Sequence, residues 1–297
     1  MSQEASPTTG RVYGVQRACT TCSFPRSMLY ARERRTKTPE RPSAKRGLKP
    51  AYSDEQLRNL MQADLKASPF SGEGHRKVWA RLKYGAGVAV SRKRVLRLMR
   101  EHNLLSPYRK PQGVSNDHDG TIGTDAPNVM WGTDGARVFT AEDGYGWIFV
   151  AVEHWNAECM GVHVCKKGDR MAALEPVAPG VLDQYGSVAR GAARGLALRM
   201  DHGTQYLSDH FQNQIKAWGI APSFAFLQEP ETNGVAERFI RTLKEQAIYG
   251  RIFQNIEEVR QAVAEFVDRY NRQWRVEKNG FRSPYEMRGL QRLPEAA

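Results

Sequence analysis

LALRMD, at residues 196–201, is a short and mostly apolar run that ends in an acid, and the turn-prone pair His202-Gly203 follows it. An apolar run of this length bounded by a turn is typical of a buried strand. The pattern therefore predicts a strand whose carboxyl end carries Asp201. Two other carboxylates, Asp134 and Glu237, lie in segments that predict different elements, and the interpretation of the chain depends on all three acids.

Asp134 closes the apolar stretch VMWGTD, residues 129–134, which is predicted to belong to a strand. Glu237 lies in NGVAERFIRTLK, residues 233–244, where apolar side chains recur at helical spacing. One polar stripe of this helix carries four side chains, namely Asn233, Glu237, Arg241 and Lys244. A solvated helix face with an ordinary ion pair between Glu237 and Arg241 is the simpler alternative.

Three acids on three separate elements can hold two divalent metal ions against a phosphodiester, provided that the fold brings them together. On that hypothesis the chain cuts and joins DNA, and Arg241 and Lys244 face the DNA backbone. The spacing of 36 residues between Asp201 and Glu237 proves little by itself. Residues 113–297 contain 24 acidic side chains, so about three pairs with this spacing should occur by chance.

Positive charge is concentrated in the N-terminal part of the 297-residue chain, whose formal net charge is +12. Residues 1–112 hold 24 Lys and Arg against 8 Asp and Glu, whereas the remainder holds 20 against 24. This asymmetry predicts a nucleic-acid-binding part joined to a nearly neutral part that carries the acids. A basic tail that only keeps the chain in solution is the alternative, and it fits residues 36–50 alone.

Composition also limits the class of protein. No apolar run approaches the ~20 residues of a membrane span, and the N-terminus lacks the apolar centre of a signal peptide. We therefore expect a cytoplasmic protein, associated with the nucleoid and without a membrane partner. Cys19 and Cys22 have the spacing of zinc ligands, but no second Cys or His pair follows at the distance typical of a zinc finger. We interpret them as buried or idle thiols.

Residues 1–50 are predicted to be a basic segment with two short helices, a partial helix-turn-helix, and a Pro-rich linker. Residues 51–112 are predicted to form a helical DNA-binding module, which the capping box Ser53-Asp54-Glu55-Gln56 opens. Helices are expected at about 75–84 and at 92–103. The outer face of the last helix carries five cations: Arg92, Lys93, Arg94, Arg97 and Arg100. This pattern favours a helix-turn-helix module on DNA, with a solvated basic helix as the alternative.

Residues 125–290 are predicted to form one α/β domain. Strand patterns cover about 130–140, 146–154 and 159–165; then follow a helix at 169–186, a strand at 196–201, a helix at 206–218, a strand at 221–226 and a helix at 233–249. A meander followed by alternating helices and strands predicts a mixed sheet flanked by helices. That order matches the ribonuclease-H-like fold, with Asp134 on the first strand, Asp201 ending the fourth and Glu237 on the helix after the fifth.

With these residues in place, the chain resembles a DDE transposase of the retroviral-integrase superfamily. It is most similar to the second open-reading-frame product of bacterial insertion sequences in the family numbered three. The resemblance covers about residues 14–290. Its motifs are GHRKVW (74–79), SRKRV (91–95), WGTD (131–134), DHGTQY (201–206), NGVAE (233–237), LKE (243–245), Tyr270-Asn271 and Ser283-Pro284.

The resemblance implies a D,D(35)E triad of Asp134, Asp201 and Glu237, two Mg²⁺ or Mn²⁺ ions as cofactors, and a contact between Lys244 and DNA. The implied activity is metal-dependent strand cleavage at the ends of an element, followed by transfer of the freed 3′-hydroxyl to another phosphodiester. The implied partners are double-stranded DNA of the ends and the target, further copies of the chain on that DNA, and the product of an upstream reading frame, fused or separate.

The chain departs from the family pattern beside the triad. Glu153-His154-Trp155 stand where relatives usually carry an Asp and a Ser-Arg pair, Arg199-Met200 replace a usual His-Ser, and the segment 230–234 differs from the usual Pro-x-Asp-Asn-Ala. These departures affect loop contacts to DNA and leave the carboxylates intact. Two other functions stay open: a non-catalytic DNA-binding regulator with an inactive core, and an RNA-strand nuclease, for which the N-terminal module has no evident use.

Overall fold

The computed structural model describes residues 3–37, 51–106, 123–225 and 233–292. Most of the predicted linker at 36–50, and the departure from the family pattern at 230–232, lie outside these ranges. The chain divides into two compact units, Met1–Ala51 and Tyr52–Ala297. Within the described ranges, no helix combines the length and the apolar character that crossing a membrane requires.

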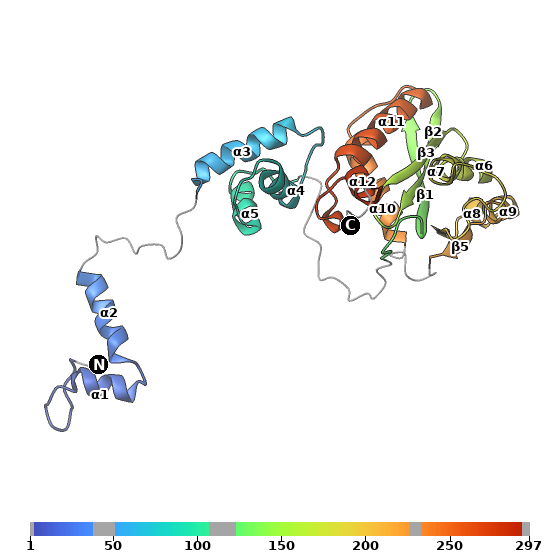
Figure 1. Cartoon of the computed structure of the whole chain (residues 1–297). Coiled ribbons are helices and arrows are strands. Elements are labelled where there is room, and N and C mark those ends of the chain that lie inside the picture. Colours follow the sequence, from blue (N-terminus) through green and yellow to red (C-terminus); the bar gives the residue numbers. More distant parts are fainter. Residues whose placement is uncertain (1–2, 38–50, 107–122, 226–232, 293–297) are drawn as a thin grey trace. The chain divides into compact units, whose positions relative to one another are not determined.

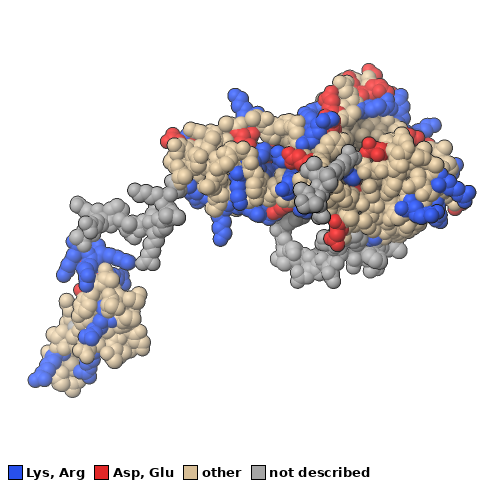
Figure 2. All heavy atoms as spheres, in the orientation of Figure 1, with Lys and Arg blue, Asp and Glu red and all other residues tan. Residues whose placement is uncertain are grey.

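The first unit contains two helices, α1 (Gly14–Thr21) and α2 (Arg26–Lys37), where two short helices are expected. Cys19 is the buried residue among those described in this unit, and α2 buries no side chain. Lys and Arg side chains gather over both helices (Figure 2). Because α2 has no buried face, it gains little stability from packing. Its most distinctive feature is its exposed cations.

The second unit begins with a helical module that contains α3 (Asp54–Ala67), α4 (His75–Ala80), the π-helix η1 (Arg81–Gly85) and α5 (Arg92–Glu101) (Figure 1). The predicted capping box is present, because the Ser53 side chain accepts from the Gln56 amide while the Gln56 side chain accepts from the Ser53 amide. The helices pack around a core of fully buried side chains, among them Leu57, Met61, Val78, Val95 and Met99.

A five-stranded mixed sheet follows, with the order β3-β2-β1-β4-β5. Its strands are β1 (Met130–Thr140), β2 (Gly144–Glu153), β3 (Cys159–Cys165), β4 (Ala197–Met200) and β5 (Ala221–Phe224). The first three strands form an antiparallel meander, whereas β4 and β5 run parallel to β1. This mixed sheet with helices confirms the predicted ribonuclease-H-like fold.

Helices cover both faces of the sheet, and each face has its own apolar core (Figure 1). On one face, Trp131 and Phe149 pack with α6 (Arg170–Leu174), α7 (Val177–Tyr185), α8 (Thr204–Leu207) and α9 (Asp209–Ala217). On the other, Ile148 and Val150 pack with α10 (Gly234–Leu243), the π-helix η3 (Lys244–Ile248) and α11 (Ile256–Gln273). The chain then continues through η4 (Glu277–Asn279) to α12 (Pro284–Arg292).

Two predicted helices are interrupted in the structure. The helix expected at 169–186 is divided into α6 and α7, because Pro176 has no amide hydrogen with which to continue the first helix. The helix expected at 206–218 starts at Thr204 and is divided at Ser208, which is extended and whose hydroxyl accepts from the Phe211 amide over 3.3 Å. Ser208 therefore caps a new helix. The helix expected at 233–249 ends as the π-helix η3.

The helical module and the sheet domain each contribute an aromatic side chain to the core of the other. Phe70, from the loop before α4, packs in the core beneath α11 with its ring 4.9 Å from that of Trp274. Phe281, from the segment before α12, is buried in the core of the helical module, 5.7 Å from Trp79. Gln246 of η3 adds two hydrogen bonds to the Ser71 backbone, accepting from its amide over 3.0 Å and donating to its carbonyl over 2.8 Å.

A buried ionic network fixes α12 against the end of β2. Arg288 lies 3.7 Å from the carboxylate of Glu153 and also pairs with Glu158, and all three side chains are buried. Glu153 further accepts from the Trp131 indole over 3.1 Å and from the Asn128 amide over 2.7 Å. Burial raises the pKa of Glu153, while the hydrogen bonds and Arg288 oppose the shift. No sequence pattern predicted this network.

Candidate active site

Asp134 lies on β1 beside the point where the pairing of β1 with β4 ends, since the last paired residues are Gly132 and Arg199. Its carboxylate is partly buried and accepts from the Gly135 amide over 2.7 Å. Burial raises the pKa of Asp134 to about 6, and the charges of Asp201 and Glu237 act in the same direction. The charges of the other two acids therefore both act on Asp134.

Asp201 directly follows β4, as the apolar run predicts. Because β4 runs parallel to β1, the carboxyl end of β4 lies next to the strand that carries Asp134. The exposed carboxylate accepts from the Gly203 amide over 2.8 Å. A β-carbon at Gly203 would lie 2.9 Å from the same carboxylate oxygen, so the glycine lets the chain fold closely around it.

Glu237 lies in the first turn of α10, which packs against β1 and β2. Lys244, at the start of η3, is half-buried, and its charge lowers the pKa of Asp134 against the effect of burial. Arg241 is exposed. Asn233 corrects the predicted polar stripe: it is buried, and its side-chain amide donates to the Thr133 carbonyl. A residue that precedes the helix does not follow the helical periodicity of the residues within it.

Asp201 and Glu237 each lie within electrostatic range of Asp134, but the acids do not form a ready-made metal cage. Among the side chains of residues 3–37, 51–106, 123–225 and 233–292, no group of three or more His, Cys, Asp or Glu could hold a metal ion. The donor set nevertheless fits a divalent cation. Carboxylate oxygens are the ligands that Mg²⁺ prefers, and a cation would relieve the repulsion that acts on Asp134.

Tyr206 is a residue of this site that sequence reasoning missed. Its side chain is completely buried, and its pKa is raised by burial first and then by the charges of Asp134 and Asp201. A neutral phenol therefore lies close to both acids. His202 stacks on Phe224 with ring centroids 5.4 Å apart. The motif DHGTQY contains both His202 and Tyr206, but the sequence does not indicate which of the two rings lies close to the acids.

Several of the predicted DNA-contacting cations of α5 form ion pairs within the chain. The five are Arg92, Lys93, Arg94, Arg97 and Arg100. Asp54 lies 2.6 Å from Arg94 and 2.7 Å from Arg97, while Glu277 lies 3.4 Å from Arg92. Lys93 and Arg100 are exposed, and neither makes an ion pair with any other residue that the structure describes. These two therefore face solvent with unneutralised charge.

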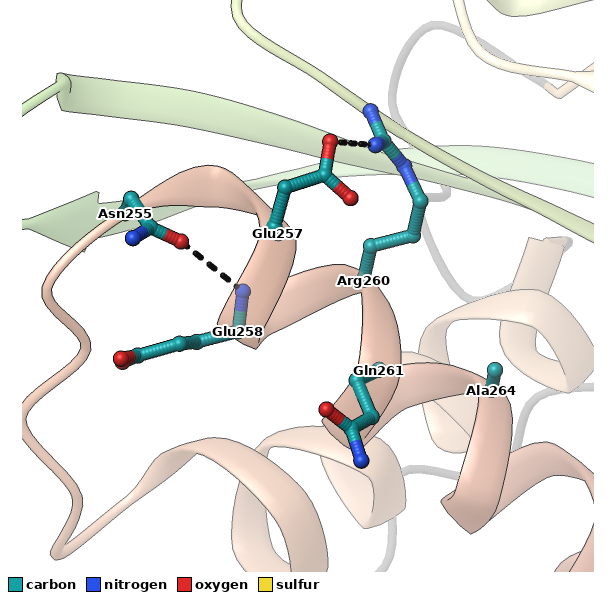
Figure 3. A pocket seen from close by; sticks show the side chains of 6 residues that line it. All are labelled: Asn255, Glu257, Glu258, Arg260, Gln261 and Ala264. Atoms are coloured by element: carbon teal, nitrogen blue, oxygen red, sulfur yellow. Dashed lines mark hydrogen bonds and ion pairs between the residues drawn. The ribbon is translucent and has the colours of Figure 1, made fainter.

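A surface hollow lies elsewhere, at the start of α11 (Figure 3). It is lined by Asn255, Glu257, Glu258, Arg260, Gln261 and Ala264. Asn255 caps the helix by accepting from the Glu258 amide over 3.2 Å, and Glu257 pairs with Arg260. These contacts complete a helix end, and the hollow contains none of the three acids. Cys19 and Cys22, buried and exposed respectively, belong to no metal-binding group among the described residues.

Comparison with known proteins finds two family models that match segments of the second unit. Residues 71–112 match the model of an HTH-like domain, and residues 208–276 match the model of an integrase core domain. The chain therefore combines an integrase core domain with an HTH-like domain that precedes it.

Its relatives include transposases of insertion elements, to which it is distantly similar. The chain is 27% identical over 223 residues to the transposase InsD for insertion element IS2A/D/F/H/I/K of Escherichia coli, and this match covers 72% of each protein. It is also 27% identical to the transposase InsD for insertion element IS2-9 of Escherichia coli strain K12, over 72% of this chain and 71% of that protein.

Two solved structures are similar at lower identity. One is the HTLV-2 integrase catalytic core domain in complex with magnesium, in its trimeric form. It has 15% identity and a TM-score of 0.41, and the match covers 54% of this chain and 96% of the other. The second is the simian T-cell lymphotropic virus intasome in complex with PP2A regulatory subunit B56 gamma, with 14% identity, a TM-score of 0.46 and coverage of 73% and 76%.

Proposed function

We propose that the chain is a DDE transposase that cleaves DNA strands at the ends of an insertion element and transfers the freed 3′ ends to target DNA. The proposal rests chiefly on the placement of the three acids: Asp134 is on β1, Asp201 follows the parallel neighbour β4, and Glu237 is in the first turn of α10, which packs against β1. The distant similarity to transposases of insertion elements supports the same activity.

Asp134, Asp201 and Glu237 would hold Mg²⁺ or Mn²⁺, as two ions. When bound, such ions activate the attacking oxygen and stabilise the leaving one in an in-line displacement at phosphorus. Lys244 and Arg241 would bind phosphate oxygens of the strand that is cut, since both are cations on the helical segment that begins with Glu237. Tyr206 would fill the space behind Asp134 and Asp201 and keep water out of it.

The remaining parts of the chain would supply DNA contacts. In this scheme residues 51–112 hold the element end, with Lys93 and Arg100 available for phosphates, residues 1–50 add a basic segment, and residues 125–290 carry out the chemistry. Two element ends must be held together for transfer, so we propose that the chain acts as an oligomer on DNA in the bacterial nucleoid. The product of an upstream reading frame would be its fusion partner or companion.

The Asp201→Asn variant tests the catalytic assignment. With Mg²⁺ or Mn²⁺ and DNA that carries the element end, the wild-type protein should nick the DNA, and the variant should lose nicking while it keeps DNA binding. Asp209→Asn, an exposed acid in the first turn of α9, is a matched control that should nick normally. Nicking by Asp201→Asn at the wild-type rate would contradict the triad. Tight binding without cleavage by wild type, alone or fused to the upstream product, would identify a regulator instead.

A further inference from the structure

A buried hydrogen bond connects the two elements that carry Asp134 and Glu237. The side-chain Nδ2 of Asn233 donates to the carbonyl oxygen of Thr133 over 3.1 Å, and Asn233 is 2% exposed. Thr133 directly precedes Asp134 in β1, and Asn233 precedes Glu237 by four residues, about one helical turn. One contact therefore ties the strand of one acid to the helix of the other.

Asn233 does not use its side chain as asparagine usually does at this position. It occupies the N-cap of α10, where an Asn side chain normally accepts from a backbone amide in the first turn of the helix. The Asn233 side chain makes no such capping bond. Its amide is directed at β1 instead, so the residue joins two elements where it would ordinarily complete only one.

The strand leaves room for this contact at Gly132. A β-carbon there would lie 3.0 Å from Oδ1 of Asn233, 3.0 Å from Nε2 of His154 and 3.3 Å from the β-carbon of Ala236, and all three distances are shorter than ordinary van der Waals contact. A larger residue at position 132 would therefore crowd the start of α10 and also the His154 ring. Gly132 and Asn233 together determine how closely the helix approaches the strand.

We propose that Asn233 is a positioning residue of the active site, which holds Glu237 at the distance from Asp134 that metal binding requires. This inference rests on the proposed function, in which both acids bind metal. Asn233 itself touches neither metal nor DNA, and it acts through the Thr133 backbone and the start of α10. Partners that orient ligand-bearing groups typically change metal affinity by about 10–100-fold when they are removed.

The test compares two buried asparagines by titration with MnCl₂ alone. Asn271 is the matched control, because it is 3% exposed and bridges α11 to the Cys159 backbone with two hydrogen bonds of 2.9 Å. Asn233→Ala should weaken Mn²⁺ binding at least about tenfold, whereas Asn271→Ala should leave it unchanged although it lowers the unfolding midpoint. Gly132→Ala, which crowds the helix start without removing the hydrogen-bond donor, should weaken Mn²⁺ binding in the same direction.

Each result is decisive. An unchanged Mn²⁺ affinity in Asn233→Ala would overturn the positioning role and leave the proposed function intact. An equal loss of Mn²⁺ affinity in Asn271→Ala would have the same meaning. If Mn²⁺ binding by the wild-type protein does not depend on Asp134, the proposed function fails. The role of Asn233 is then tested by measuring the stability of the metal-free protein. In that case Asp134→Asn should raise the unfolding midpoint less in the Asn233→Ala background than in wild type, because Glu237 has moved away. An equal rise in both backgrounds overturns the proposal.

Discussion

Asp134 combines burial with like-charged neighbours, and both disfavour its ionised form. Its carboxyl has a pKa of about 6 in the folded chain, against an ordinary value of 3.8. The folded state therefore binds the proton more tightly than the unfolded state does. The stability that this proton contributes is fully present below about pH 4 and is lost as the pH rises through about 6. At pH 8 and without metal, the Asp134 charge destabilises the fold.

The Asp134→Asn variant should therefore be more stable than wild type at pH 8 in the presence of a chelator. The expected gain is about 2 kcal/mol, allowing for solvent screening at a partly exposed side chain. At pH 4 the gain should nearly vanish, because wild-type Asp134 is then protonated. Urea denaturation at the two pH values measures both free energies of unfolding. A gain of equal size at both would show that the charge is not the cause.

Sequence patterns were sufficient to assign each acid to its element, because burial periodicity is a local property. They could not show the mutual influence of the acids, which depends on distances between residues far apart in the chain. Asn233 illustrates the same limit, since helical spacing places it on a polar stripe while the structure buries it against Thr133. Tyr206 is likewise defined as part of the site only by what lies beside it.

Among the elements, α12 shows how a short terminal helix is held in place. Arg288 enters a buried site between Glu153 and Glu158 and is the partner of opposite charge for both carboxylates. Removing Arg288 leaves both carboxylates buried without that partner, which is far more costly than the ion pair is favourable.

Arg288→Ala should accordingly lower the free energy of unfolding by about 3–5 kcal/mol. Arg272→Ala is the matched control, because Arg272 pairs with Asp268 on the exposed side of α11 and should change stability little. Equilibrium urea denaturation of both variants checks the difference. Similar stabilities for the two variants would mean that water compensates the buried carboxylates.

Element boundaries were predictable where a cluster of turn residues separates the elements and were missed where apolar spacing continues across the boundary. The meander was recognised because its strands are long and its turns carry Asp, Gly and Asn. The interruptions at Pro176 and Ser208 were missed because apolar spacing continues across both, although each residue has a local reason to end or begin a helix. The π-helical end of this run, η3, has no local signal in the sequence.

At the scale of the whole molecule, cations of the helical module are neutralised by acids distant in sequence. Glu277 lies 2.6 Å from Arg76 and 3.4 Å from Arg92, the first residue of α5. The net charge of residues 1–112 therefore overstates the positive charge available to DNA. Sequence reasoning counted these cations correctly but could not identify their partners, because the ion pairs join positions about two hundred residues apart.

Glu277→Gln should tighten DNA binding several-fold at low ionic strength, since it releases two cations for phosphate contacts. The gain should shrink as salt rises, because screening weakens every such contact. Glu257→Gln, which frees Arg260 on α11, is the control and should change affinity little. Fluorescence anisotropy with labelled DNA over a salt series measures both variants. An affinity unchanged by Glu277→Gln at low salt would exclude competition between Glu277 and DNA.

The double hydrogen bond of Gln246 to the Ser71 backbone has a mechanical consequence. Gln246 lies in η3, which directly continues α10, the helix that carries Glu237, so this helical run is anchored near its far end to the helical module. A helix is stiff along its axis, so a displacement of one end is transmitted to the other. In the function that we propose, a movement of the module when it binds duplex DNA would therefore also displace Glu237, which would couple DNA binding to the relative positions of the three acids.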